Sequence, residues 1–157
     1  MALASAHTEQ KRFDEAEQQF LSTLERLRRV FGVADSLTIT TMNQFEVLYY
    51  RQQQYAKALP LAEQVLKGSR TLFGDDAPRT LLAQGNLADN LGKLRRYDEA
   101  EELFRKALEG QQHVLGLDHP FTRRTFTKFA EMYEAWGKPD KAIELRAKLP
   151  KGAASKP

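Results

Sequence analysis

The sequence RRYDEAEELFRKAL, from Arg95 to Leu108, decides the fold because closely similar sequence, KRFDEAEQQFLSTL, occurs earlier at Lys11–Leu24. Comparison of the chain with itself shows that equivalent positions recur every 42 residues. The recurring sets are Phe13, Tyr55, Tyr97 and Pro139; Ala16, Ala58, Ala100 and Ala142; Gly32, Gly74 and Gly116; and Thr38, Thr80 and Thr122. A fixed period of this length predicts an array of structural repeats, each burying its apolar face against its neighbours.

Apolar residues within each repeat are spaced by three and four positions, as on one face of an α-helix. In the third repeat they form two sets: Leu81, Leu82, Leu87, Ala88, Leu91 and Leu94, then Ala100, Leu103, Phe104, Ala107 and Leu108. The spacing predicts two helices in each repeat and an all-α fold.

The second helix of each repeat ends on an apolar pair and a glycine. These triplets are Val30-Phe31-Gly32, Leu72-Phe73-Gly74 and Val114-Leu115-Gly116. Glycine adopts the left-handed conformation that terminates a helix, and we expect the apolar pair to fold back onto that helix. We also expect Asp76 and Asp118 to cap the following helices, and Pro78 and Pro120 to open them.

Composition restricts the class of protein. The chain has 157 residues, of which 41% are hydrophobic and 29% charged, with a formal net charge of +3. This charge is too small to predict a nucleic-acid partner, so RNA binding ranks lowest among the functions considered. No apolar run approaches the roughly 20 residues of a membrane span. The absence of Cys from the sequence excludes disulfides and thiolate metal sites. We expect a soluble, cytoplasmic protein without a membrane partner.

Catalytic motifs are missing from the sequence. The three histidines, His7, His113 and His119, show no metal-binding spacing, and no phosphate-binding loop or nucleophile motif occurs. Glu101 and Glu102 each precede a basic residue by four positions, which is typical of ion pairs on a helix surface. We therefore expect no enzyme activity, no cofactor and no metal. His119 is expected to have a structural or capping role.

Several motifs resemble the tetratricopeptide repeat (TPR). They are Leu87-Ala88, Leu91, Tyr97-Asp98-Glu99-Ala100, Phe104, Ala107 and Leu108. The 42-residue length and the linker LGLDHPFT resemble the kinesin light chain type of this repeat. The resemblance implies a right-handed α-solenoid of stacked antiparallel helix pairs. It also implies one domain over residues 1–150, comprising a partial repeat at 1–34, which begins inside its first helix, and repeats at 35–76, 77–118 and 119–150. Residues 151–157 are expected to form a disordered tail.

The resemblance also implies a concave groove lined by the first helix of each repeat. Transferred by register, the groove residues are Asn43, Val47, Tyr50, Arg51, Asn86, Asp89, Lys93, Arg124, Lys128 and Glu131. Amides, charges of both signs and an aromatic ring suit an extended peptide, whose backbone and side chains both need partners. The function implied is a non-enzymatic interaction module, in a scaffold or adaptor role, for a protein or peptide partner.

Alternative interpretations remain for several of these residues. Asn86 could simply be solvated, and either Tyr49 or Tyr50 must face inward, with Tyr49 favoured by register. Gly85 and Gly92, inside a helix, could admit a ligand backbone or merely weaken the helix.

A structural role is the alternative function. In this hypothesis the chain stacks through its terminal helices, the last of which carries Ile143, Leu145 and Leu149. The chain would then be a monomer or associate weakly with itself.

Overall fold

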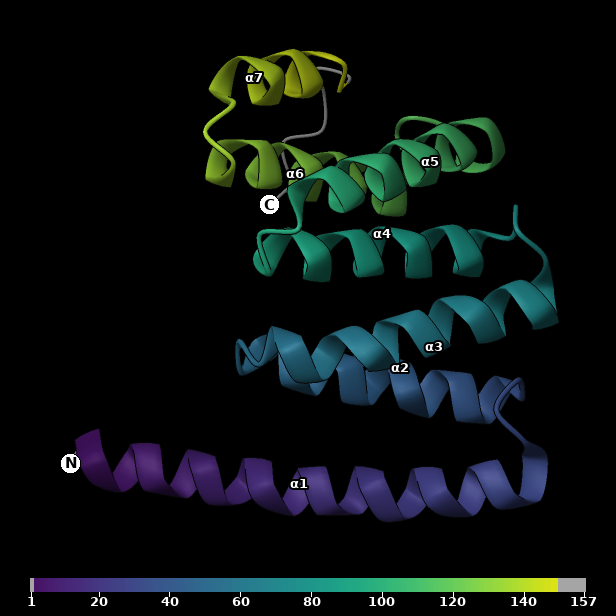
Figure 1. The fold of residues 1–157 in the computed structure, drawn as a ribbon, viewed down its shortest axis with the longest axis vertical. Coiled ribbons are helices and arrows are strands. Elements are labelled where there is room, and N and C mark those ends of the chain that lie inside the picture. Colours follow the sequence, from purple (N-terminus) through teal and green to yellow (C-terminus); the bar gives the residue numbers. More distant parts are fainter. Residues whose placement is uncertain (1, 150–157) are drawn as a thin grey trace, which may run out of the picture. The chain divides into compact units, whose positions relative to one another are not determined.

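The structure, a computed structural model, describes the backbone of residues 2–149 and the side chains of residues 11–149. Within this range the chain forms seven α-helices and no strand (Figure 1). They are α1 (Ala2–Phe31), α2 (Ser36–Arg51), α3 (Tyr55–Phe73), α4 (Pro78–Lys93), α5 (Tyr97–Leu115), α6 (Pro120–Ala135) and α7 (Pro139–Ala147). The all-α prediction is therefore confirmed, whereas the predicted tail lies outside the described residues.

Three-residue turns join α2 to α3, α4 to α5 and α6 to α7, as the repeat predicts. The middle residue of each turn, Gln53, Arg95 or Gly137, has a positive φ of 57°, 61° or 75°. These positions are spaced by the 42-residue period, so the backbone repeats along with the sequence. The left-handed conformation reverses the chain within a short turn.

The first repeat departs from this pattern. Its corresponding residue is Lys11, which lies inside the continuous helix α1. The two helices predicted for each repeat are therefore one continuous helix here. Continuing the helix avoids a left-handed lysine and keeps these backbone hydrogen bonds.

The loops that follow α1, α3 and α5 begin with a left-handed glycine, as predicted. Gly32, Gly74 and Gly116 have φ values of 85°, 87° and 83°. Most residues of the apolar pairs before them are not covered, however: Val30, Phe31, Leu72, Phe73 and Val114 are exposed, and only Leu115 is half-buried. The glycine ends each helix before the chain can cover these side chains.

The N-caps lie one residue later than the sequence suggested. Ala77 and His119 occupy the cap positions of α4 and α6, and the prediction of Asp76 and Asp118 as caps is wrong. Pro78 and Pro120 are the first helical residues, as predicted. Because proline fixes the start of each helix, the residue directly before it becomes the cap.

The described residues form two compact units, one that ends at Gly68 and one that begins at Ser69. In the first, α1 packs against α2, with the rings of Phe20 and Phe45 stacked at 5.1 Å. In the second, α4, α5 and α6 pack together and α7 covers α6. There Phe104 and Phe129 stack at 4.9 Å. Among the aromatic residues, Phe13 and Phe104 are buried, whereas Phe20, Tyr55, Tyr97 and Trp136 are half-buried.

Candidate functional site

The polar face shared by α4 and α6 brings together five of the predicted groove residues. Nη2 of Arg124 donates to Oδ1 of Asn86 over 3.4 Å, a long contact between the two helices. Nζ of Lys128 lies 3.8 Å from Oδ2 of Asp89 and 3.1 Å from Oε2 of Glu131. These contacts place an amide, two carboxylates and two cations in two sets on the same pair of helices, which together we call the α4–α6 cluster.

Two glycines of α4 set the distance between the helices that carry this cluster. A Cβ atom on Gly85 would lie 3.2 Å from Oγ1 of Thr125, and one on Gly92 would lie 2.8 Å from Cγ of Met132. Both glycines thus face α6 rather than open space. The sequence suggested that they admit a ligand or weaken the helix, but the structure shows a packing role. Their small size lets side chains on α4 reach those on α6.

The exposure of the cluster is graded. Asp89 is buried, Asn86, Lys128 and Glu131 are half-buried, and Arg124 is exposed. The sixth predicted residue of this unit, Lys93, is exposed at the end of α4. Asp89 beneath Lys128 holds the ammonium group in place, so this cation can meet a ligand with little loss of side-chain freedom. The cluster therefore offers donors and acceptors that are already oriented.

The remaining four predicted residues lie on α2, in the first unit. Asn43, Val47 and Tyr50 are half-buried, and Arg51 is exposed. The rings of Tyr50 and Tyr55 meet edge to face at 5.2 Å. Tyr49 is buried, which confirms the choice of this tyrosine as the one facing inward.

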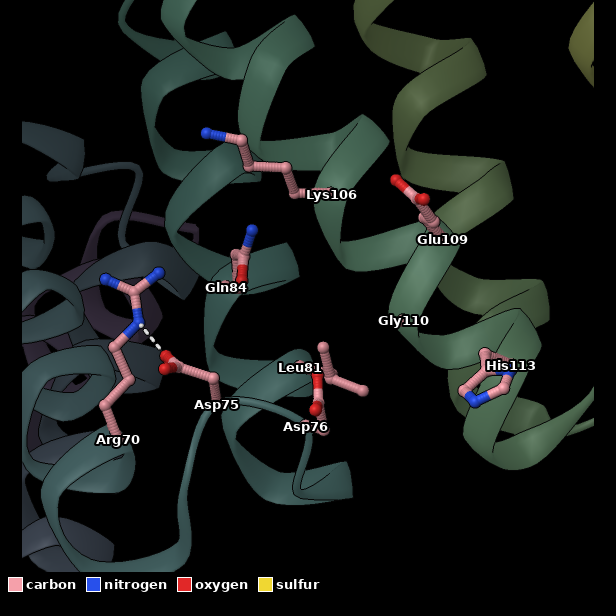
Figure 2. Close-up of a pocket in the computed structure, with 9 residues that line it drawn as sticks. All are labelled: Arg70, Asp75, Asp76, Leu81, Gln84, Lys106, Glu109, Gly110 and His113. Carbon is pink, nitrogen blue, oxygen red and sulfur yellow. Dashed lines mark ion pairs between the residues drawn. The ribbon is translucent and has the colours of Figure 1, made fainter.

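Three cavities that sequence reasoning missed lie beside the second helices of the repeats. The one in Figure 2 has a volume of about 540 Å³. It is lined by Arg70, Asp75, Asp76, Leu81, Gln84, Lys106, Glu109, Gly110 and His113. Arg70 and Asp75 point toward each other across one side, with Nε and Oδ1 3.1 Å apart (Figure 2).

The other two cavities, of about 650 and 290 Å³, are related by the repeat. The first is lined by residues of α1, α2 and α3, including Leu24, Phe45 and Leu61. The second is lined by residues of α5, α6 and α7 and one residue just after α7, including Leu108 and Phe129. None of the ten predicted groove residues lines any of these three cavities. The sequence showed little sign of them because their lining combines core residues such as Leu24 and Phe129 with polar residues of different helices.

The structure also shows the role of His119 and the placement of the acidic side chains and histidines. Nδ1 of His119 accepts a hydrogen bond of 3.2 Å from the backbone N–H of Phe121, which confirms the predicted capping role. Residues 11–149 contain no group of three or more His, Asp or Glu side chains placed to hold a metal ion. Among the helices described, none combines the length and the apolar character needed to cross a membrane.

Comparison with known proteins identifies the repeat. A family model described as tetratricopeptide repeat matches residues 1–71, 47–112 and 79–146, which together span almost the entire chain. The chain belongs to the tetratricopeptide repeat family. No curated protein sequence matches it. TPR domains are in general protein–protein interaction modules and typically act as non-enzymatic scaffolds.

Solved structures of TPR proteins share the fold. Two show the nearly identical TPR-like repeats of a Podosopora anserina protein described as a kinesin light chain. One of them has a TM-score of 0.78 at 21% identity, covering 94% of this chain and 69% of that one. The other has a TM-score of 0.76 at 20% identity, covering 98% and 76%. BtubC (BKLC) from P. vanneervenii has a TM-score of 0.70 at 21% identity, covering 98% and 63%. The kinesin light chain type predicted from the 42-residue repeat thus agrees with these folds.

Proposed function

We propose that this TPR chain is a scaffold or adaptor module that binds a short, extended peptide segment of a partner protein on the α4–α6 cluster. Two sets of contacts support the proposal. Arg124 contacts Asn86, and Lys128 contacts both Asp89 and Glu131. An extended peptide presents N–H and C=O groups that lose water on binding, and amide side chains satisfy both. The corresponding residues of α2 are proposed to have the same role within their own unit.

The charges of this face favour a particular ligand. Lys93, Arg124 and Lys128 supply three cations against the carboxylates of Asp89 and Glu131. Lys128 is already engaged by both carboxylates, whereas Arg124 and Lys93 are exposed. A peptide carrying an acidic side chain near Arg124 or Lys93 therefore fits best. A segment of a few residues buries little surface, so the proposed affinity is modest.

The test is isothermal titration of peptides selected by display on the parent protein. Replacing Asn86→Ala together with Lys93→Ala removes one amide and one ammonium group from this face. The matched control, Gln112→Ala with Lys106→Ala, removes the same two groups from exposed positions on α5. We expect the first variant to bind at least about tenfold more weakly, a change of about 1.4 kcal/mol, and the control to bind as the parent does. Equal binding by all three proteins would exclude the α4–α6 cluster as the site.

Stacking through the terminal helices has weaker support. Of the three apolar residues near the end of the chain, Ile143 is 64% exposed, but Leu145 is buried within its own unit and Leu149 is half-buried. A single exposed side chain provides little area for association. Sedimentation of the parent and of Ile143→Glu tests this alternative. Their sedimentation should differ only if the parent stacks through this helix.

A further inference from the structure

We infer that the α1–α2 loop is a second docking surface, separate from the α4–α6 cluster, for a partner peptide that carries both large apolar and acidic side chains. The surface consists of Val30, Phe31, Val33 and Leu37, which we call the α1–α2 patch. These residues end α1, form the loop and begin α2.

Exposure distinguishes this patch from isolated apolar residues on the surface. Val30 is 64% exposed, Phe31 59%, Val33 60% and Leu37 54%. All four lie within eight consecutive residues around a single loop. Single exposed apolar side chains are common in monomeric proteins, but a cluster of this kind marks an interaction site.

The backbone beneath the patch is fixed by hydrogen bonds. The N–H of Gly32 donates to O of Arg28 at 3.1 Å, and the N–H of Ile39 donates to O of Asp35 at 2.9 Å. Oδ1 of Asp35 accepts from the N–H of Leu37 at 2.8 Å, which caps α2. The four apolar side chains are therefore displayed by an ordered loop. A ligand would bind them without the cost of ordering the loop.

The next loop shows that the turn itself does not require apolar residues. Its backbone also begins with a left-handed glycine, but Asp75 and Arg79 replace Val33 and Leu37. Asp75 pairs with Arg70 at 3.1 Å, and the guanidinium of Arg79 lies 5.4 Å from the ring centre of Phe73. This loop therefore has charged side chains at both positions, and one of them lies over the ring of Phe73.

The loop between α5 and α6 has an apolar residue at both positions, but only one of the two is exposed. Leu117 replaces Val33 and remains exposed, but Phe121, which replaces Leu37, is half-buried and meets the ring of His119 edge to face at 5.0 Å. Of the three loops, the α1–α2 loop alone displays four exposed apolar side chains at these positions. The difference comes from the side chains, since the three loops share one backbone design.

Charges beside the patch indicate the kind of partner. Residues 26–37 carry three arginines and one aspartate, a local charge of +2. Arg28 donates to Oε1 of Gln64 at 2.7 Å, whereas Arg26 and Arg29 are exposed on the last turns of α1. The single carboxylate, Asp35, is engaged in capping α2. Carboxylates on a ligand would meet arginines at the edge of an apolar surface, which is the usual arrangement at interfaces.

The same charges disfavour other occupants. In a twofold dimer built on this patch, the arginines of one copy would lie close to those of the other, which costs free energy. A membrane surface would attract the arginines, but a peripheral helix binds lipid through an apolar stripe along its length. Here two of the apolar residues end α1, one lies in the loop and one begins α2, so they do not form such a stripe.

In the experiment, displayed random peptides of about 12 residues are selected for binding to the parent. Peptides that also bind the double variant Val33→Asp, Leu37→Arg are then discarded. This variant introduces the residues that the second loop already carries at these positions, so it is compatible with the fold. Circular dichroism and thermal unfolding check that it is folded. A selected peptide is then titrated against the parent, this variant, Arg26→Gln with Arg29→Gln, and Asn86→Ala with Lys93→Ala.

We expect the selected peptides to combine Leu, Phe or Val with Asp or Glu. Binding should weaken at least about tenfold in the loop variant, a change of about 1.4 kcal/mol. It should weaken less in the arginine variant, with loss of salt dependence. The Asn86 and Lys93 variant should bind normally, which separates this surface from the proposed α4–α6 site.

Four results would overturn the inference. Three of them are the absence of peptides specific for the parent, equal binding by the loop variant, and selection of basic peptides. The fourth is that no peptide binds, whereas anionic phosphatidylserine vesicles bind the parent but not the loop variant. Concentration-dependent dimerisation of the parent that the loop variant abolishes would assign the patch to a second copy instead.

Discussion

The hydroxyl of Tyr133 donates a hydrogen bond of 2.8 Å to Oε1 of Glu101. Tyr49 makes the same contact with Glu17 at 2.7 Å, at positions 84 residues earlier for both partners. Each bond joins the second helix of one repeat to the first helix of the next. The chain thus repeats a polar contact between repeats as well as its apolar packing.

The first prediction concerns the pH dependence of this contact. Burial of the Glu101 carboxyl opposes ionisation, but hydrogen bonds from Tyr133 and Lys141 outweigh it and hold the pKa of Glu101 below its ordinary value. A lowered pKa in the folded state stabilises the protein above about pH 4.5, and this contribution is lost as the pH falls through the folded pKa. Tyr133→Phe should therefore lower the free energy of unfolding by about 1–2 kcal/mol at neutral pH.

Urea unfolding of Tyr133→Phe and the parent, at neutral pH and in acid, measures this effect. The loss should shrink in acid, where the carboxyl is protonated. Tyr97→Phe is the matched control, because its hydroxyl donates to the neutral carbonyl of Ala135 at 3.1 Å. Its effect should not depend on Glu101. A loss for Tyr133→Phe that is independent of pH would contradict the proposed coupling.

The second prediction concerns the cap of α2. Oδ1 of Asp35 accepts from the N–H groups of Leu37 at 2.8 Å and Thr38 at 3.2 Å. Asp35→Ala removes both bonds and should destabilise the protein by about 1 kcal/mol. Asp35→Asn should retain most of the stability, because an amide oxygen also caps a helix. Chemical unfolding of the three proteins tests this order, and equal loss in both variants would indicate a role for the charge rather than the hydrogen bonds.

The third prediction concerns the close approach of α4 and α6. Gly92→Ala should improve intrinsic helix propensity by about 1 kcal/mol, but the added Cβ would lie 2.8 Å from Cγ of Met132. Since overpacking of this kind costs about 1–3 kcal/mol, we expect a net loss of stability. Gly85→Ala, with a nearest contact of 3.2 Å to Thr125, should be tolerated better. Thermal unfolding measures both, and greater stability for Gly92→Ala would show that α6 moves freely.

Sequence reasoning anticipated the fold because the repeat constrains each element several times. The 42-residue period, the left-handed glycines and Pro78 and Pro120 all agree on where helices begin and end. It did not anticipate the continuous helix α1, because a pattern carried over from the other repeats does not show whether the backbone at Lys11 adopts their left-handed turn. Tertiary context decides such cases.

The candidate site was only partly predictable for a related reason. Register placed Asn86 and Arg124 on helices that meet, and the structure brings them into contact. The packing role of Gly85 and Gly92 depends on the side chains opposite them, which no pattern within one helix reveals. The exposure of Phe31 was equally hidden, because its chemistry predicts burial and only the path of the loop prevents it.

The fourth prediction concerns Pro60, which lies inside α3. It is the sixth residue of that helix, beyond the first turn, where it cannot donate a hydrogen bond to O of Ala56. The corresponding residues in the other repeats are Gln18, Glu102 and Glu144, and all three are helical. Pro60→Glu therefore installs a residue type that the repeat already accepts at this position.

Restoring the backbone hydrogen bond should recover much of the roughly 3 kcal/mol that an interior proline costs a helix. Proline also restricts the unfolded chain, so its removal stabilises the unfolded state by about 0.4–1 kcal/mol. The two effects leave a net gain of about 2 kcal/mol, measurable by urea unfolding. Gln18→Pro, the reverse change in α1, should lose about 3 kcal/mol. If Pro60→Glu proves less stable than the parent, α3 must depend on the bend that proline imposes, and its packing rather than its hydrogen bonding would decide this position.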